Sequence, residues 1–389
     1  MQSIDLNLRH LRAFGAIMES GSMTAAARQI HLTQPAITQG IAKLERQLGA
    51  ILFERQPGQM VPTPTASLLA PRARATLRLI GLPRATAAQV RAFLALAASG
   101  SYSGAAIETG LSEASLHRVV GDLALVAGHA LVERRGKGVV LTARGVALAR
   151  RFRLAVAELR SARAELAAQG GNGREKIVIG AMPLSRARLL PSAIVAFNRR
   201  FPNVEIVVVE GGHAELVGPL RDGGMDIMIG AERAEPLADL VQQALFDDRL
   251  VVLGRAGHPL TALNRAANIA ELAQYPWVVP GAGTPLRHHW QSMFENAGML
   301  PPSVPVECGS VMTVRQILVE TDFLTLLSPD QVALELRAGA LAQIGALSPE
   351  VTRVIALTVR ADWRPTASQS AFIGVTLDEA AKLRGHHNL

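Results

Sequence analysis

Amide and hydroxyl side chains gather in one short stretch near residue 33, where the sequence reads Thr-Gln-Pro-Ala-Ile-Thr-Gln. Glutamine can recognise adenine through two hydrogen bonds, and threonine can offer a hydroxyl group, or a methyl group to thymine. The basic residues that follow suit the phosphate backbone of DNA. This chemistry predicts DNA contacts from Thr33, Gln34, Pro35, Ala36, Thr38, Gln39, Lys43 and Arg55.

These side chains require a scaffold, and the spacing of apolar residues predicts one made of three short helices. The first covers about 8–18, and an alanine-rich helix over 24–30 ends at a tight turn. Thr33 then caps a third helix that runs to about Leu48. The segment after Gly49 predicts a β-hairpin, so the pattern is typical of a winged helix-turn-helix, whose third helix enters the major groove by its N-terminus. The alternative is a helical bundle with a solvated polar face.

The same pattern occurs twice in the front half of the chain. Residues 11–66 align without a gap onto residues 90–145, so equivalent residues lie 79 positions apart, and 17 of the 56 aligned positions are identical. The Ser-Gly-Ser stretch at 20–22, for example, matches the one at 99–101. A duplication of this kind predicts a second winged helix-turn-helix over 81–141.

The second copy keeps the skeleton but changes the reading face. Glu113 stands where the first copy has Gln34, and Asp122 stands where it has Lys43. Its hairpin is more basic than the first, so we favour a second module that grips mainly the DNA backbone over a degenerate copy kept for spacing and packing. The candidate contacts of this copy are Ser112, Ser115, His117, Arg118, Arg134, Arg135 and Lys137.

The charge of the chain is spread unevenly. Residues 1–169 carry 21 Lys and Arg against 10 Asp and Glu, a net charge of +11, whereas residues 170–389 carry 19 against 22, a net charge of −3. The two sums recover the net charge of +8 of the whole chain. This asymmetry indicates that the front half meets a polyanion such as nucleic acid.

The segments that follow the two hairpins differ. Pro62, Pro64 and Pro71 follow the first one, and because a helix interior tolerates proline poorly, we expect no long helix there and assign residues 1–80 to the first module. After the second hairpin, an almost uninterrupted run predicts a linker helix over 142–169. Its apolar stripe consists of Val146, Ala149, Phe152, Val156 and Leu159.

From residue 176 on, strand and helix patterns alternate, which predicts an α/β domain with parallel sheets over 170–389. The pattern divides into two lobes, the first over about 174–254 and 355–389 and the second over about 255–354. Two such lobes joined by crossing strands resemble the fold of periplasmic binding proteins, which close around a ligand by hinge motion. The fold class is therefore α/β overall, with two winged helix-turn-helix modules and a linker helix in front.

Glycine and hydroxyl residues follow several of the predicted strands. Ligands of open α/β sheets bind beyond the C-terminal ends of the strands, and helix N-termini there suit a carboxylate or a phosphate. The alternative for each Ser and Thr is ordinary helix capping, and Arg287 can equally form a surface ion pair. The candidate effector contacts are Pro183, Leu184, Ser185, Gly212, His213, Pro280, Gly283, Thr284, Arg287, Gly309 and Ser310.

Taken together, these motifs resemble those of the LysR-type transcriptional regulators, over nearly the whole chain. The residues of the first module that carry the resemblance are Phe14, Ser20-Gly21-Ser22, Thr24-Ala25-Ala26-Ala27, Gln34-Pro35-Ala36, Leu44-Glu45, Leu48-Gly49 and Leu52-Phe53-Glu54-Arg55. The stretches Gly-Ala-Met-Pro-Leu-Ser and Gly-Thr-Pro-Leu-Arg look like the subgroup that controls aromatic-acid catabolism and sugar-binding-protein genes. The second winged helix departs from the usual family member, which has one, and leaves the operator length and geometry open.

The resemblance implies a sequence-specific regulator that binds double-stranded DNA, acts on RNA polymerase, and forms a homodimer or homotetramer in the cytoplasm. In this family the long helix after the wing pairs two subunits, so the resemblance assigns the subunit contact to 142–168. It also implies that the back half binds a small anionic effector, an aromatic or dicarboxylic acid.

Other classes of function fit the sequence less well. No Gly-x-Ser-x-Gly elbow, phosphate-binding Gly-Lys-Ser/Thr loop or His-Glu-x-x-His motif is present, so we predict no enzyme, no cofactor and no metal site. Cys308 is the single cysteine, which leaves a redox sensor as one alternative and a non-sensing architectural DNA-binding protein as another. The basic front half and the lack of a signal-peptide pattern argue against a secreted solute-binding protein, and no apolar run predicts a membrane span.

Overall fold

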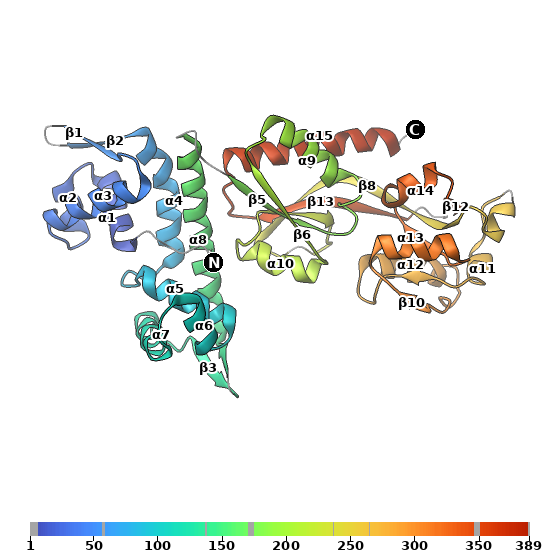
Figure 1. The fold of residues 1–389 in the computed structure, drawn as a ribbon, viewed down its shortest axis with the longest axis horizontal. Helices are drawn as coiled ribbons and strands as arrows, with labels where there is room; N and C mark the ends of the chain where they lie inside the picture. Colours follow the sequence, from blue (N-terminus) through green and yellow to red (C-terminus); the bar gives the residue numbers. More distant parts are fainter. Residues whose placement is uncertain are drawn as a thin grey trace. The chain divides into compact units, whose positions relative to one another are not determined.

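The computed structural model describes residues 7–56, 59–136, 138–169, 175–235, 237–263, 265–345 and 351–387. The chain divides into two compact units (Figure 1). The first comprises Met1–Lys176 with Asp222–Gly224, and the second comprises Ile177–Arg221 with Met225–Leu389. None of the helices among the described residues is long and apolar enough to cross a membrane.

The first copy of the repeat folds as three helices, a hairpin and a fourth helix. Its elements are α1 (Leu8–Ser20), α2 (Met23–Gln29), α3 (Gln34–Leu48), β1 (Phe53–Gln56), β2 (Gln59–Pro62) and α4 (Pro64–Ile80). A polar side chain caps each helix by accepting from a first-turn N–H group, as Thr33 does from Ala36 at 3.4 Å. Apolar side chains of α1 and α3, among them Phe14, Ile37 and Leu44, are fully buried in the shared core.

The second copy has the same elements in the same order. They are α5 (Ala87–Ser99), α6 (Tyr102–Thr109), α7 (Glu113–Ala127), β3 (Val132–Arg135), β4 (Gly138–Leu141) and α8 (Ala143–Gln169). Equivalent hydrogen bonds tie each hairpin to its helices. The N–H of Met60 donates to the carbonyl of Gly21 at 2.9 Å, and that of Val139 donates to the carbonyl of Gly100 at 3.0 Å. The two copies therefore share one local architecture (Figure 1).

The tight turn before the third helix of each copy needs a left-handed backbone. His31 adopts a φ of 52° in the first copy, and Gly110, which lies 79 positions later, adopts a φ of 71° in the second. Residues other than glycine rarely adopt this conformation, because the Cβ atom crowds the backbone. The same turn is thus built twice, and only the first copy builds it at a residue with a side chain.

The prediction that prolines prevent a long helix after the first hairpin is wrong. Pro62 ends β2, but α4 continues from Pro64 for 17 residues with Pro71 inside it. Proline is accepted in the first turn because its missing N–H group has no intrahelical partner there anyway. An internal proline costs about 3 kcal/mol, and the burial of α4 side chains such as Leu69 and Ile80 against neighbouring helices offsets that cost.

The linker helix predicted over 142–169 is present as α8, but its apolar stripe faces the interior of its own unit. Phe152 and Leu159 are buried, and the Phe152 ring packs edge-on against Phe93 of α5 with ring centroids 6.1 Å apart. Helix α8 also packs along α4 (Figure 1). Ala149, Phe152 and Leu159 of the stripe are thus buried within one chain, whereas Val146 is exposed. The subunit contact assigned to 142–168 stays a prediction, and other faces of α8 would have to make it.

The second unit alternates strands and helices as predicted. Its elements are β5 (Lys176–Ala181), α9 (Leu189–Arg200), β6 (Glu205–Glu210), α10 (His213–Arg221), β7 (Ile227–Ala231), β8 (Leu240–Arg255), η1 (Pro259–Leu263), α11 (Ile269–Leu272), β9 (Val278–Val279), α12 (Pro285–Glu295), β10 (Val306–Glu307), α13 (Val311–Glu320), β11 (Thr325–Leu327), η2 (Pro329–Val332), α14 (Ala333–Arg337), β12 (Leu341–Gly345), β13 (Val351–Arg360) and α15 (Ala367–His387).

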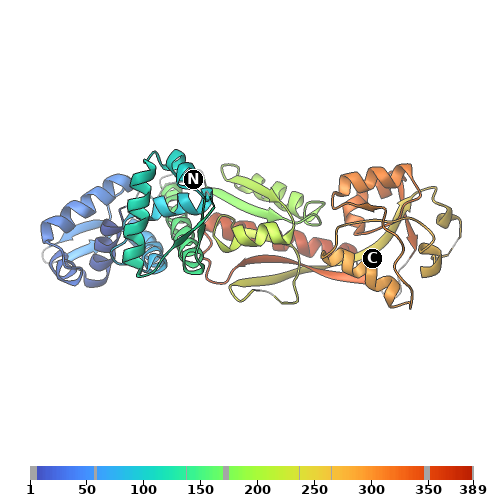
Figure 2. The same ribbon diagram turned by 90° about the horizontal axis from the view of Figure 1, so that it is seen from below.

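Two long strands join the two lobes of this unit. The strand order of the main sheet is β11-β8-β13-β7-β5-β6, with β12 paired to β8. The pairs β5–β7 and β9–β10 are parallel, as the alternation predicted, whereas β13 runs antiparallel to both β7 and β8. In Figure 2, β8 and β13 run side by side from one lobe into the other. Phe246 and Ile355 of these strands enter the core of the first lobe, and Leu250 enters that of the second.

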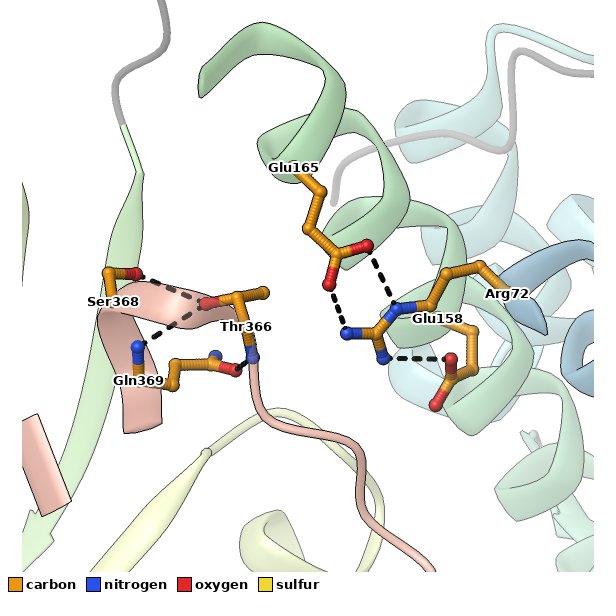
Figure 3. Close-up of polar contacts among 6 residues, drawn as sticks. All are labelled: Arg72, Glu158, Glu165, Thr366, Ser368 and Gln369. Carbon is orange, nitrogen blue, oxygen red and sulfur yellow. Dashed lines mark hydrogen bonds and ion pairs between the residues drawn. The ribbon is translucent and has the colours of Figure 1, made fainter. Parts of the chain in front are cut away.

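The start of α15 is held by a buried polar cluster (Figure 3). The backbone N–H of Thr366 donates to Oε1 of Gln369 at 2.8 Å, and that of Gln369 donates to Oγ1 of Thr366 at 3.3 Å. The Ser368 hydroxyl lies 3.1 Å from the same Oγ1 atom. This reciprocal cap fixes the entry of α15, whose Phe372 then packs edge-on against Phe197 of α9.

Candidate DNA interface and ligand cavity

The start of α3 presents a polar face to solvent. Thr33, Gln34, Pro35, Ala36 and Gln39 are exposed and Thr38 is half-buried. The opposite face of the helix is buried in the core of the first copy, as the helical spacing of its apolar residues predicted. The side chains proposed from the sequence as base contacts therefore lie on one accessible surface, with Lys43 exposed further along the same helix.

The hydroxyl of Thr38 is already engaged by its own surroundings. Its Oγ1 atom donates to the carbonyl of Gln34 at 3.0 Å and lies 3.3 Å from the Met23 sulfur. With its proton committed, this hydroxyl can only accept from DNA. The amide groups of Gln34 and Gln39 are therefore the better candidates for reading a base by donating and accepting together.

Glu45, which no sequence pattern singled out as functional, joins the reading helix to the hairpin. Oε1 of Glu45 on α3 accepts from the backbone N–H groups of Leu52 at 2.8 Å and Phe53 at 3.4 Å. This bond holds the hairpin, with exposed Arg55 on β1, in a fixed place beside α3. The only sequence signal for it is the Leu-Glu pair at 44–45, which carried the family resemblance without a stated role.

The second copy offers fewer free polar groups. The Ser112 hydroxyl accepts from the N–H of Ser115 at 3.2 Å as the cap of α7, and it donates to the Ser115 hydroxyl at 2.9 Å. The His117 ring, although exposed at its edge, stacks on Tyr102 with centroids 3.5 Å apart. Ala124 replaces Glu45, so the hydrogen bonds by which Glu45 holds the first hairpin have no counterpart at this position of α7.

The exposed cations of the second copy are Arg118 on α7 and Arg134 and Arg135 on β3. Lys137, also a predicted contact, lies outside the described residues. This surface suits phosphate groups better than base edges, because the serine hydroxyls are committed to capping and the arginines stand on the wing.

The second unit contains a cavity of about 850 Å³ between its two lobes. It lies where strands of both lobes end and where α10, α12 and α13 begin. Of the predicted effector contacts, the structure places Pro183, Leu184, Gly212, His213, Pro280, Gly283, Thr284, Gly309 and Ser310 around it. The rule that ligands lie beyond the strand ends thus located the cavity from the sequence.

Two predicted effector contacts do not line the cavity. Ser185 is buried, and its hydroxyl donates to the carbonyl of Met182 at 2.9 Å, which stabilises the turn after β5. Arg287 packs its guanidinium over the Trp290 ring, 4.8 Å from the centroid, and pairs with Glu307 at 3.3 Å. Because both side chains are engaged in local packing, the cavity lining gives these two predicted contacts no support.

The capping alternative holds for both hydroxyl residues at the helix starts. Thr284 accepts from the N–H of Arg287 at 3.3 Å, and Ser310 accepts from that of Thr313 at 3.4 Å. The caps orient α12 and α13 so that their first turns face the cavity. A helix N-terminus carries a partial positive charge and favours an anion. The two helix starts can therefore attract an anion into the cavity, although the Thr284 and Ser310 hydroxyl groups serve as caps.

Three arginines that were not among the predicted effector contacts also line the cavity, and they differ in their partners. Arg186 pairs with Glu210, and Nε of Arg353 donates to Oδ2 of buried Asp248 at 2.9 Å. Arg233 lines the cavity without an acidic partner among the described residues, and its Nε atom is buried without a hydrogen bond. Arg233 is therefore the cation that remains for an anionic ligand.

His213 adds a neutral group beside Arg233. Burial, and after it the charge of Arg233, lowers the pKa of His213, so the imidazole is uncharged at neutral pH. Cys308 also lines the cavity and is partly exposed. Among the described residues, no group of three or more His, Cys, Asp or Glu side chains could hold a metal ion.

Comparison with known proteins assigns both parts of the chain to one family. The family description "Bacterial regulatory helix-turn-helix protein, lysR family" matches twice, at residues 8–67 and 87–146, and "LysR substrate binding domain" matches residues 170–381. The chain is 32% identical to the HTH-type transcriptional regulator GalR of Pseudomonas putida, over 91% of this chain and 92% of that protein.

More distant relatives agree with this match. The chain is 24% identical to the HTH-type transcriptional regulator PcaQ of Agrobacterium fabrum, over 70% of this chain and 88% of that one. Its fold is similar to that of ArgP from Mycobacterium tuberculosis, with a TM-score of 0.58 at 16% identity, over 75% of this chain and 96% of that chain.

Proposed function

This chain belongs to the LysR family of bacterial transcriptional regulators, and from that premise we propose that it reads a specific operator through two winged helix-turn-helix modules and senses a small anion in its second unit. Its relatives are regulators rather than enzymes. The observation that carries the DNA part is the exposed polar start of α3, with Gln34 and Gln39 on one face. The protein would work in the cytoplasm on duplex DNA and RNA polymerase, as a homodimer or homotetramer.

The effector part rests on the cavity and its charge. A volume of about 850 Å³ suits a small metabolite. Arg233 and the starts of α12 and α13 favour a carboxylate, so we propose an aromatic or dicarboxylic acid as the ligand class. The start of α10 contributes less, because the carboxylate of Glu215 in its first turn already accepts from the N–H of Gly212. A two-lobed effector domain that closes over the ligand, in the manner of periplasmic binding proteins, would transmit the binding event.

Ligand-dependent thermal stabilisation separates a sensor from an architectural DNA-binding protein. A ligand at about 100 times its Kd stabilises the state that binds it by about 2.7 kcal/mol, which raises the melting temperature of the second unit. The panel consists of benzoate, hydroxybenzoates, succinate and malate. No shift with any acid of the panel would favour the architectural role.

Gln34→Ala is expected to weaken specific operator binding by about 1–3 kcal/mol, because the amide reads a base edge. Binding to non-specific DNA, which depends on phosphate contacts, should stay within about twofold. A footprint on the DNA upstream of the coding region, with affinities measured on the protected fragment and on an unrelated one, gives both numbers. The control is Gln29→Ala, an exposed glutamine on α2 that pairs with Glu19. Equal losses of affinity on the operator fragment and on the unrelated fragment would show that Gln34 does not read a base.

The double change Arg134→Ala and Arg135→Ala is expected to make DNA binding less dependent on salt. Each lost phosphate contact reduces the slope of log affinity against log salt by about 0.9, so two contacts reduce it by about 1.8. The matched control changes Arg74 and Arg78, two exposed arginines of α4 that belong to no reading face. An unchanged slope in the wing variant would show that the second copy acts as a spacer.

A further inference from the structure

We propose that a single chain carries both members of a DNA-reading pair, related by an internal pseudo-twofold axis, and that it binds one two-part DNA site whose halves differ in sequence. This proposal rests on the DNA-binding function proposed above. It concerns only the first unit, and it starts from contacts between the two copies of the repeat.

The two copies meet through equivalent helices. Helix α4 begins at Pro64 and α8 begins at Ala143, which are equivalent positions in the repeat, 79 residues apart. These helices pack along one another inside the first unit (Figure 1). An interface made by the same surface of two equivalent modules is the arrangement of a symmetric dimer, here formed within one chain.

The contacts between α4 and α8 are reciprocal. Nη1 of Arg72 lies 3.1 Å from Oε2 of Glu158 (Figure 3). The residue equivalent to Arg72 is Arg151, and the one equivalent to Glu158 is Leu79. Nε of Arg151 donates to the carbonyl of Leu79 at 3.0 Å. When residue i of one copy meets residue j of the other, and j meets i in return, the two copies are related by a twofold axis.

The reading faces of the pair are not equivalent. Where the first copy presents Gln34 and Lys43, the second presents Glu113 and Asp122. A perfect palindrome offers the same base edges to both modules, so it would suit only one of them. The fitting partner is a DNA site with one half read mainly by base contacts from α3 and another held mainly through its backbone.

A basic groove of about 1240 Å³ lies between the two copies. Its charged side chains are Arg9, Arg12, Lys43, Arg46, Arg84 and Arg91, and none of the described residues that line it is acidic. The Arg12 guanidinium donates to the carbonyl of Leu82 at 3.1 Å, which ties α1 to the connection between the copies. This groove supplies positive charge for the phosphates that join the two half-sites.

Because the pair is built into one folded unit, the distance between its reading helices is set by the protein. Helix-turn-helix pairs bind half-sites that lie one or more helical turns apart, and each turn takes about 10 base pairs. Adding about five base pairs between the half-sites turns one of them to the opposite side of the duplex. A rigid pair then loses one half, and the expected loss of affinity is about tenfold or more.

Hydroxyl-radical footprinting of the full chain on the DNA upstream of its coding region tests the proposal. We expect two protected patches: Gln34→Ala weakens protection at one of them, and Arg118→Ala with Arg134→Ala weakens it at the other. The duplex is then trimmed to these two patches and mixed with the protein until it saturates. The expected ratio is one duplex per chain, whatever the oligomeric state.

Four results would overturn the proposal. Three of them are a response of both patches to Gln34→Ala alone, one duplex bound per two chains, and full affinity after the five-base-pair insertion. The fourth is a single patch that depends on Gln34 and does not respond to the second-module variants; it would leave DNA binding by the first module intact and remove only the pairing of the two modules. Absence of any protected site would instead contradict the DNA-binding function itself.

Discussion

Arg72→Met is expected to lower the free energy of unfolding of the first unit by about 3–5 kcal/mol, the usual effect of removing one partner of a buried ion pair. The Arg72 side chain is only 3% exposed, and its Nε and Nη1 atoms donate to Glu165 at 3.2 Å and to Glu158 at 3.1 Å. Burial alone would lower the pKa of Arg72, but its hydrogen bonds to Glu165 and Glu158 outweigh burial and raise it. The variant leaves two carboxylates facing an apolar neighbour.

Chemical unfolding followed by far-ultraviolet circular dichroism measures this loss. All three tryptophans, Trp277, Trp290 and Trp363, lie in the second unit, so tryptophan fluorescence reports that unit alone and should not change. The control Arg74→Met removes an exposed arginine of the same helix and should stay within about 0.5 kcal/mol.

A second variant tests whether the unpaired carboxylates cause the loss of stability. Adding Glu158→Gln and Glu165→Gln to Arg72→Met removes the unpaired charge and should restore part of the lost stability, because neutral amides can be buried at lower cost. A loss below about 1 kcal/mol for Arg72→Met alone would show that the ion cluster contributes little to the packing of α4 on α8.

Arg233→Ala is expected to weaken the binding of a carboxylate effector by about 10- to 100-fold. A hydrogen bond to a charged group contributes roughly 1.5–3 kcal/mol, and each 1.4 kcal/mol changes affinity tenfold. Arg233 is the lining arginine without an acidic partner among the described residues, so its charge is available to the ligand. Its backbone is held in place by Gln242, whose amide bonds both its N–H and its carbonyl.

Titration calorimetry with the acid from the panel that stabilises the wild-type protein most gives the Kd of each variant. The matched control is Arg186→Ala, since Arg186 lines the same cavity but is already paired with Glu210. Its removal should change the Kd by less than about threefold. Equal losses for the two variants would mean that the cavity responds to its total charge and not to Arg233 in particular.

Much of the local structure could be predicted from the sequence, because its signals lie within a few residues of one another. Caps such as Thr33, the spacing of apolar residues in α3, and the glycine at the end of that helix are all read within one or two turns. The repeat then predicted the same elements a second time. The exposed reading face of α3 followed directly, since a helical period determines which side chains point away from the core.

The contacts between distant segments could not be predicted in this way. Pro71 argued against a helix, yet α4 forms because α8, some 80 residues later in the chain, covers its apolar face. The apolar stripe of α8 could also be read from the sequence, but not the surfaces that bury Phe152 and Leu159 within the same chain. Local periodicity shows that a face is apolar, and only the packing of the whole unit shows what covers it.

The cavity shows the same division. The sequence by itself determined that glycines and capping residues follow the strands, and so it located the cavity and nine of its lining residues. The tertiary structure decided which charges enter it: Arg353 reaches the cavity on β13 because that strand pairs with β8, where its partner Asp248 lies. Arg353 and Asp248 lie 105 residues apart in the chain and meet only because their strands pair. No local sequence pattern predicts such a contact.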